Sequence, residues 1–176
     1  EANAFYLPQE KQVVMCLEFF FLVLQELEPL AESDEQLAEW TVGTFVYTFY
    51  HEIGHALIDI LELPAVGREE DAVDQLAALV MLGDGDPEGL DALDSAVAFF
   101  VIAGANQVAM GQLPFWDEHS LSLQRAYDLA CLAYGHDQSY FSTYLEFLPQ
   151  ERAQGCVAEY ERINGSWDTL LEPYLK

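Results

Sequence analysis

A helical period of polar and apolar residues dominates the middle of this chain. Over residues 34–61, polar residues recur every three or four positions and form one stripe, while apolar residues occupy the other sides. The stripe includes Thr41, Thr44, Thr48, His51, Glu52, His55 and Asp59. Ser33 and Gln36 form a capping-box pattern at the start of the run. The sequence therefore predicts a long buried helix whose polar stripe needs a partner inside the protein.

The flanking segments predict a hairpin and further helices. Residues 4–21 are rich in β-branched and aromatic residues, and a turn signal that starts at Pro8 divides them into two short strands. Apolar residues recur with helical spacing in the segments 17–30, 68–81, 90–110, 120–134, 139–147, 150–163 and 167–174. We expect a single domain over residues 1–176, mainly helical within the α+β class, with a short N-terminal hairpin or small sheet beside the central helix.

The charge balance excludes some classes of partner. The chain has 31 acidic residues against 6 basic ones, a formal net charge of −25. Such a protein is repelled by nucleic acid phosphates and by anionic membrane surfaces, so neither is an expected partner. We also expect no membrane span, because the apolar run at residues 13–24 contains Glu18 and is shorter than the roughly 20 residues that a span needs.

The chemistry concentrates in the segment His51-Glu52-Ile53-Gly54-His55, an HExxH motif on the predicted central helix. Residues four positions apart share one face of a helix, so both imidazoles can reach one zinc ion. Glu52 is rotated by about 100° from His51, which places it beside the metal. There it can act as general base toward a water molecule that the metal activates.

A zinc ion held by two histidines needs a third protein ligand. The longer histidine motif, which takes its third histidine from the same segment, is excluded, because the positions that it requires hold Ile58 and Leu61. The alternative is an acidic residue on the following helix, where the candidates are Glu69, Glu70 and Asp71. Glu70 is the candidate that has another acidic residue, Asp74, one turn later on its own face. A carboxylate at that position can accept the free N–H of a ligand histidine, so we predict Glu70 as the ligand and Asp74 as its support.

These residues carry a family resemblance. The HExxH motif with Glu70-x-x-x-Asp74 resembles the gluzincin pattern of thermolysin-like and CAAX-processing zinc proteases, and residues 51–77 are similar to a bacterial metallopeptidase family known as a domain of unknown function. The similarity continues from His119 to Trp167. It implies a zincin-like domain with Zn²⁺ as cofactor. It also implies that residues 13–17 form the sheet edge that aligns a substrate beside the cleft.

Two further candidates come from the same resemblance. His119 and Arg125 resemble a His-Pro-x-x-x-x-Arg element of the CAAX-processing relatives, although Ser120 replaces the proline. His119 is expected to donate a hydrogen bond to the oxyanion of a tetrahedral intermediate, or else to be a loop histidine at a helix start. Arg125 pairs with a site carboxylate or with a surface acid. Asp59, one turn after His55, either supports the metal site or is a solvated carboxylate.

The cysteines bear on the compartment. Cys131 and Cys156 belong to no CxxC pair, so they form a disulfide or lie as two buried thiols, and the pattern favours the disulfide. Cys16 is expected to be an ordinary buried residue. The suspected disulfide, the acidic surface and the resemblance together predict a secreted or periplasmic protein, although the first residues show no signal-peptide pattern.

The functional hypothesis is a zinc-dependent endopeptidase that acts on a peptide or protein substrate. His51, His55 and Glu70 bind the metal, and Glu52 takes the proton of the attacking water. The alternative is a zincin scaffold that binds zinc and serves as a binding module without turnover. The presence of Glu52 argues against the alternative, because a purely structural metal site does not need that residue.

Overall fold

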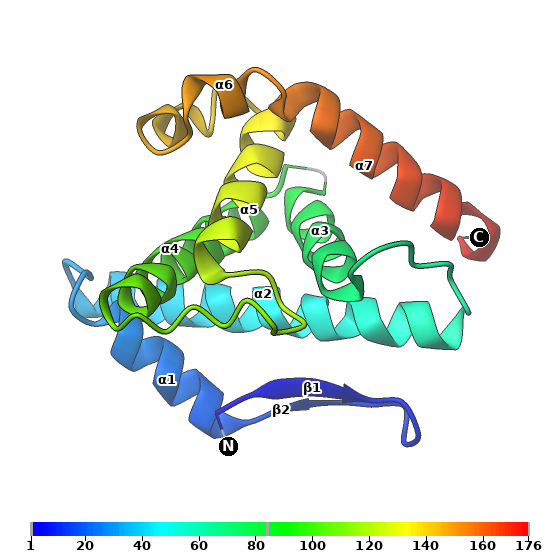
Figure 1. Ribbon diagram of the computed structural model, residues 1–176, viewed down its shortest axis with the longest axis horizontal. Coiled ribbons are helices and arrows are strands. Elements are labelled where there is room, and N and C mark those ends of the chain that lie inside the picture. Colours follow the sequence, from blue (N-terminus) through cyan, green and yellow to red (C-terminus); the bar gives the residue numbers. More distant parts are fainter. Residues whose placement is uncertain (1, 84, 176) are drawn as a thin grey trace.

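The computed structural model describes residues 2–83 and 85–175, and it is mainly helical with one small sheet (Figure 1). The elements are β1 (Ala4–Leu7), β2 (Gln12–Met15), α1 (Leu17–Leu27), α2 (Asp34–Ile60), α3 (Glu69–Leu82), α4 (Pro87–Ala109), α5 (Ser122–His136), the 3₁₀ helix η1 (Ser142–Glu146), α6 (Gln150–Ala153), α7 (Cys156–Leu171) and the 3₁₀ helix η2 (Glu172–Tyr174). β1 and β2 pair antiparallel, with Phe5 opposite Val14. The predicted fold class, a helical protein with an N-terminal hairpin, is confirmed.

Helix α2 is the element on which the other parts are assembled. It crosses the whole molecule, with α3, α4 and α5 on one side and the hairpin and α1 on the other (Figure 1). The expected cap is present, because the Ser33 hydroxyl accepts a hydrogen bond from the Gln36 N–H at 3.2 Å. The Gln36 side chain in turn accepts the N–H of Glu32. These bonds satisfy N–H groups at the helix start that would otherwise lack a partner.

The N-terminal half of the polar stripe on α2 is satisfied by main-chain carbonyls. Thr41 and Thr48 donate to carbonyls one turn earlier in α2, and Thr44 donates to the carbonyl of Ser95 in α4. A side chain at Gly43 would lie 2.7 Å from the Ser95 hydroxyl, so glycine is required for this close approach of α2 and α4. This leaves the C-terminal half of the stripe, which carries the HExxH motif, to face α3.

Helix α3 meets α2 at a second close contact. A Cβ atom at Gly54, inside the HExxH motif, would lie 2.8 Å from the side chain of Val73 in α3. Val73 is fully buried at this crossing. Because both helices pack directly against each other there, the first two turns of α3 lie beside the histidines of α2. The acidic first turn of α3 therefore lies next to the HExxH motif.

Helices α4 and α5 supply most of the remaining core. α4 packs most extensively against α2 and α5. By length and composition α4 could also cross a membrane. Here its buried residues, which include Leu93, Val97 and Phe100, belong to the main hydrophobic core. An apolar helix of this kind is expected at the centre of a helical domain.

The C-terminal region differs from the sequence-based expectation. The predicted break between residues 163 and 167 is wrong, because α7 continues through Gly165. Ile163 and Trp167, one turn apart, are both buried on the inner face of this helix, and their packing outweighs the roughly 1 kcal/mol cost of a glycine in a helix interior. The break falls instead at Gln154 and Gly155, between α6 and α7. The helix expected at residues 139–147 is the short 3₁₀ helix η1.

A disulfide bond joins Cys131 of α5 to Cys156 at the start of α7, and Cys16 is free. Both bonded cysteines are fully buried. One turn after Cys131, a side chain at Gly135 would lie 2.3 Å from the carbonyl oxygen of Cys156. The bond therefore fastens α7 to α5 at a point where the two backbones are in direct contact.

We expect thiol titration of the denatured, unreduced protein to find one reactive cysteine. Replacing Cys131 and Cys156 together by alanine should lower the free energy of unfolding in urea by about 3 kcal/mol, because the unfolded chain gains the entropy that the closed loop had removed. Cys16→Ala is the matched control and should change stability far less. Three reactive thiols in the untreated protein would contradict the prediction.

Candidate metal centre

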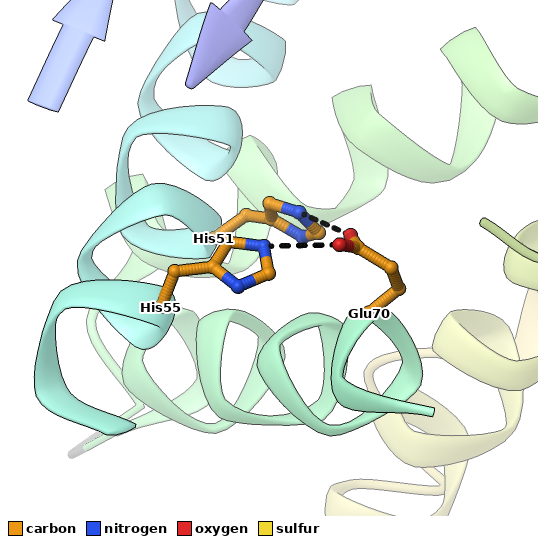
Figure 2. Close-up of side chains that lie close together, drawn as sticks. All are labelled: His51, His55 and Glu70. Carbon is orange, nitrogen blue, oxygen red and sulfur yellow. Dashed lines mark ion pairs between the residues drawn. The ribbon is translucent and has the colours of Figure 1, made fainter. Parts of the chain in front are cut away.

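Two helices bring three potential metal ligands together. His51 and His55 lie one turn apart on α2, and Glu70 lies in the first turn of α3. One ligand atom from each lies within 4.8 Å of the other two. Figure 2 shows both imidazoles pointing from α2 toward the Glu70 carboxylate. The distance from Nε2 to the nearest Glu70 oxygen is 3.2 Å for His51 and 3.4 Å for His55.

The geometry fits a divalent metal ion. Atoms bound at about 2.1 Å to a tetrahedral ion lie roughly 3.4 Å from one another, close to the distances observed here. Glu70 Oε2 is buried and makes no hydrogen bond of acceptable geometry among the described residues, although histidine nitrogens lie nearby. A buried carboxylate oxygen without a donor is costly, and a bound cation would satisfy it. These three residues can therefore hold a metal.

The surrounding carboxylates attract positive charge to this position. Burial disfavours the ionised form of Glu70, but the neighbouring histidines hold the pKa of its carboxyl well below the usual range. Burial also disfavours the charged form of His55, yet Glu70 and Glu69 outweigh it and raise the pKa of this imidazole to about 9. The site thus favours a cationic partner, whether a proton or a metal ion.

The Nδ1 atom of each candidate ligand histidine contacts a carboxylate. His51 Nδ1 lies 2.7 Å from Asp74, and His55 Nδ1 lies 2.7 Å from Glu69. A proton on each Nδ1 then faces a carboxylate and leaves the Nε2 lone pair facing Glu70, the arrangement that metal ligation needs. The sequence pointed to Asp74 for this role. It missed Glu69, which is adjacent to Glu70 and faces the next turn of α2.

Asp74 joins three helices in one buried network. It accepts hydrogen bonds from Tyr47 at 2.8 Å and from Arg125 Nε and Nη2 at 2.7 and 2.6 Å, in addition to its contact with His51. The Arg125 guanidinium also lies 4.1 Å from the centre of the Phe100 ring. Burial opposes ionisation of Asp74, but Arg125 and His51 keep the pKa of its carboxyl well below normal. Of the two roles considered for Arg125, the structure shows pairing with a site carboxylate.

Tyr47 was not identified from the sequence. It lies one turn before His51 on α2 and is fully buried. Burial and the nearby Asp74 raise the pKa of its phenol well above the usual value, so it donates as a neutral hydroxyl. A tyrosine at this helical spacing from a ligand histidine is the signal that could have revealed it.

Glu52 lines the same cavity as the three potential ligands. This cavity has a volume of about 470 Å³ and is bounded by α2, the start of α3, His119 and β1. Burial raises the pKa of the Glu52 carboxyl, although the two histidines and the N–H of Tyr6 oppose this in part. A carboxylate with a raised pKa is better able to take up a proton near neutral pH.

The strand beside the cavity is β1, and the expectation for residues 13–17 is wrong. Residues Asn3 to Tyr6 and Pro8 line the cavity, whereas no residue of β2 does, and Leu17 already begins α1. The hairpin is fastened to α2 by Asp59, which accepts hydrogen bonds from Tyr6 and Lys11. Asp59 therefore orients the hairpin and does not contact the ligand histidines.

His119 lies at the same cavity, on the segment between α4 and α5. Its Nε2 is 3.0 Å from Glu70 Oε2, and its ring stacks on that of His51 with centroids 6.0 Å apart. Ser120, which replaces the proline of the related element, donates to Asp71 of α3 at 2.7 Å and ties this segment to α3. The two sequence candidates His119 and Arg125 are thus both brought to the site.

A histidine pair on a buried helix, a glutamate from the next helix and a carboxylate in the adjoining cavity define a helical protein with a candidate metal centre of the HExxH type. Comparison with known families agrees with this class. The chain belongs to a family described as "Putative metallopeptidase", whose profile matches residues 1–171. The resemblance to a metallopeptidase family of unknown function is confirmed. Neither the curated proteins nor the solved structures contain a significant match.

The Asp74 network provides a test of the arrangement. Asp74→Ala removes the partner of a buried arginine and of His51, so the free energy of unfolding should fall by about 3–5 kcal/mol. Asp91→Ala is a suitable control, because Asp91 is exposed and bonds Tyr140 at the surface. We expect the control to change stability by less than about 0.5 kcal/mol in the same urea titration. Equal effects of the two substitutions would contradict the network.

Proposed function

We propose that this protein is a zinc-dependent endopeptidase. The observation that carries the proposal is the buried carboxylate of Glu70, in a cavity that Glu52 also lines. Its unbonded Oε2 faces Nε2 of His51, and its Oε1 faces Nε2 of His55. Two imidazoles and one carboxylate are the donor set that suits zinc, whereas magnesium and calcium prefer oxygen ligands. Bound zinc would supply Lewis acidity toward a peptide carbonyl and toward water.

The other roles in the proposed reaction fall to residues around the ligands. Glu52 accepts the proton of the attacking water and later delivers it to the leaving amine, and its raised pKa favours the uptake of the proton. Asp74 and Glu69 hold the two histidines in the tautomer that presents Nε2. Glu70 raises the pKa of His119, and in its protonated form this imidazole, at the cavity, can donate a hydrogen bond to the carbonyl oxygen.

The hairpin supplies a surface for an extended substrate. β1 is paired with β2 along one edge, and its other edge borders the cavity. The Tyr6 N–H already points at Glu52 on that side. A peptide added to β1 as a further strand would therefore pass directly over the general base.

We also propose a secreted or periplasmic location. The buried Cys131–Cys156 disulfide supports it, because such bonds persist in oxidising compartments. The net charge of −25 favours solubility in water and is compatible with this location.

Metal analysis of two neighbouring variants tests the ligand set. Glu70→Ala should abolish stoichiometric zinc binding, because it removes a ligand. Glu69→Ala should keep the site but weaken zinc affinity by about 10–100-fold, because it removes the carboxylate behind His55. Zinc content and competition with a chromophoric chelator distinguish the two effects. Full zinc affinity in Glu70→Ala would refute the assignment.

The role of Glu52 is tested separately from metal binding. Glu52→Gln should retain zinc and fold but lose at least about 10²-fold in kcat on a peptide library, because glutamine cannot take up the proton. Glu118→Gln, at an exposed carboxylate that lines the same cavity, is the control for a lost negative charge and should retain most of the activity. A zinc-loaded wild type that cleaves no peptide would instead support a binding scaffold.

A further inference from the structure

The three histidines at the cavity share one arrangement. In His51 and His55, Nδ1 faces a carboxylate and Nε2 faces Glu70. His119 repeats both contacts, with Nδ1 3.1 Å from Asp117 Oδ1 and Nε2 3.0 Å from Glu70 Oε2. Nothing in the HExxH motif requires a third histidine with a carboxylate behind it. The repetition indicates that His119 is prepared for the same partner as the other two.

The hydrogen bond with Asp117 decides which nitrogen of His119 is free. An ionised carboxylate accepts and cannot donate, so the proton of His119 is held on Nδ1 and the lone pair is left on Nε2. Asp117 also accepts the backbone N–H of His119, which fixes the two residues relative to each other. The Nε2 lone pair then faces an oxygen of Glu70 at 3.0 Å, and a cation between these two atoms would stabilise the pair. The 3.0 Å between His119 Nε2 and Glu70 Oε2 is near the spacing of roughly 3.4 Å expected for two ligands of one tetrahedral ion. His119 lies outside the group of ligand atoms that are within 4.8 Å of one another, so its ring has to move toward His51 to reach the same ion.

We propose that His119 is a fourth protein ligand of the metal in the resting protein, and that it is the ligand that leaves when a substrate carbonyl arrives. The inference rests on the metal site of the proposed function but not on peptide hydrolysis. In the free protein, His119 would therefore occupy the coordination position that a substrate carbonyl needs. Substrate binding then requires the exchange of one imidazole for one carbonyl oxygen.

Several features make His119 the exchangeable histidine. Its side chain is 40% exposed, whereas those of His51 and His55 are 4% and 14% exposed. Its ring centroid is 6.0 Å from that of His51, compared with 5.0 Å for His55, so it approaches from farther out. It is also carried by an irregular segment and not by α2. Phe115 and Trp116 of that segment are 72% and 86% exposed, so little packing resists a small movement.

X-ray absorption of the zinc-loaded full chain counts imidazole ligands directly. We expect three in the wild type, two in His119→Ala and three in His136→Ala. His136 is the control, because it bonds Tyr160 and does not line the cavity. Acetohydroxamate, which binds zinc as a carbonyl mimic does, should reduce the wild-type count from three to two.

Zinc affinity gives an independent readout. In chelator competition, His119→Ala should bind zinc at least about 10-fold more weakly than the wild type, and His136→Ala should not differ from it. Asp117→Asn keeps the side-chain shape and should weaken binding by a smaller factor while the count stays at three. This second variant keeps the test valid if circular dichroism shows that His119→Ala is misfolded.

The outcomes separate this inference from the proposed function. Two imidazoles in the wild type, or unchanged zinc affinity in His119→Ala, would overturn it and leave His119 as a hydrogen-bond donor alone. A wild type that binds no zinc would overturn both the inference and the metal site. Three imidazoles in a protein that cleaves no peptide would support the inference and count against the peptidase.

Discussion

The site depends on one buried carboxylate. Asp74 of α3 holds His51 and Tyr47 of α2 and the guanidinium of Arg125 of α5, so a single side chain connects three helices. Burying a charge of this kind is costly unless it is paired and fully hydrogen-bonded, and here both conditions are met. The same contacts that offset the cost of burial also set the tautomer of a ligand histidine. The stability of the fold and the geometry of the candidate metal site are therefore coupled through Asp74.

Close helix packing makes this network possible. Gly43 lets α2 approach α4, and Gly54 lets it approach α3 at Val73. A larger residue at Gly54 would push α3 away and separate Glu70 from the histidines. The glycine of the HExxH motif is thus a requirement of packing here, in addition to any requirement of chemistry.

Negative charge accumulates around the cavity. The carboxylates that contact its histidines or line it include Glu52, Glu69, Glu70, Asp59 and Asp117. Such a group of acids repels itself in the absence of positive partners, and imidazoles balance it in part. A divalent cation at the centre would relieve the remaining repulsion. The acidic character of the protein therefore has a local counterpart that favours metal binding.

The sequence by itself determined the helices, the hairpin and the HExxH face, because periodicity, caps and spacing within one helix are local properties. It also indicated Glu70 with Asp74, since residues one turn apart share a face. Only the tertiary structure decided that β1 and not β2 borders the cavity. It also decided that Tyr47 bonds Asp74, and that Glu69 and Asp117 bond histidines of the site. Those choices depend on how elements distant in sequence are rotated against one another, and packing of α2 with α3 and the hairpin sets that rotation. The course of α7 through Gly165 follows the same rule, because the burial of Ile163 and Trp167 outweighs a local helix-breaking signal.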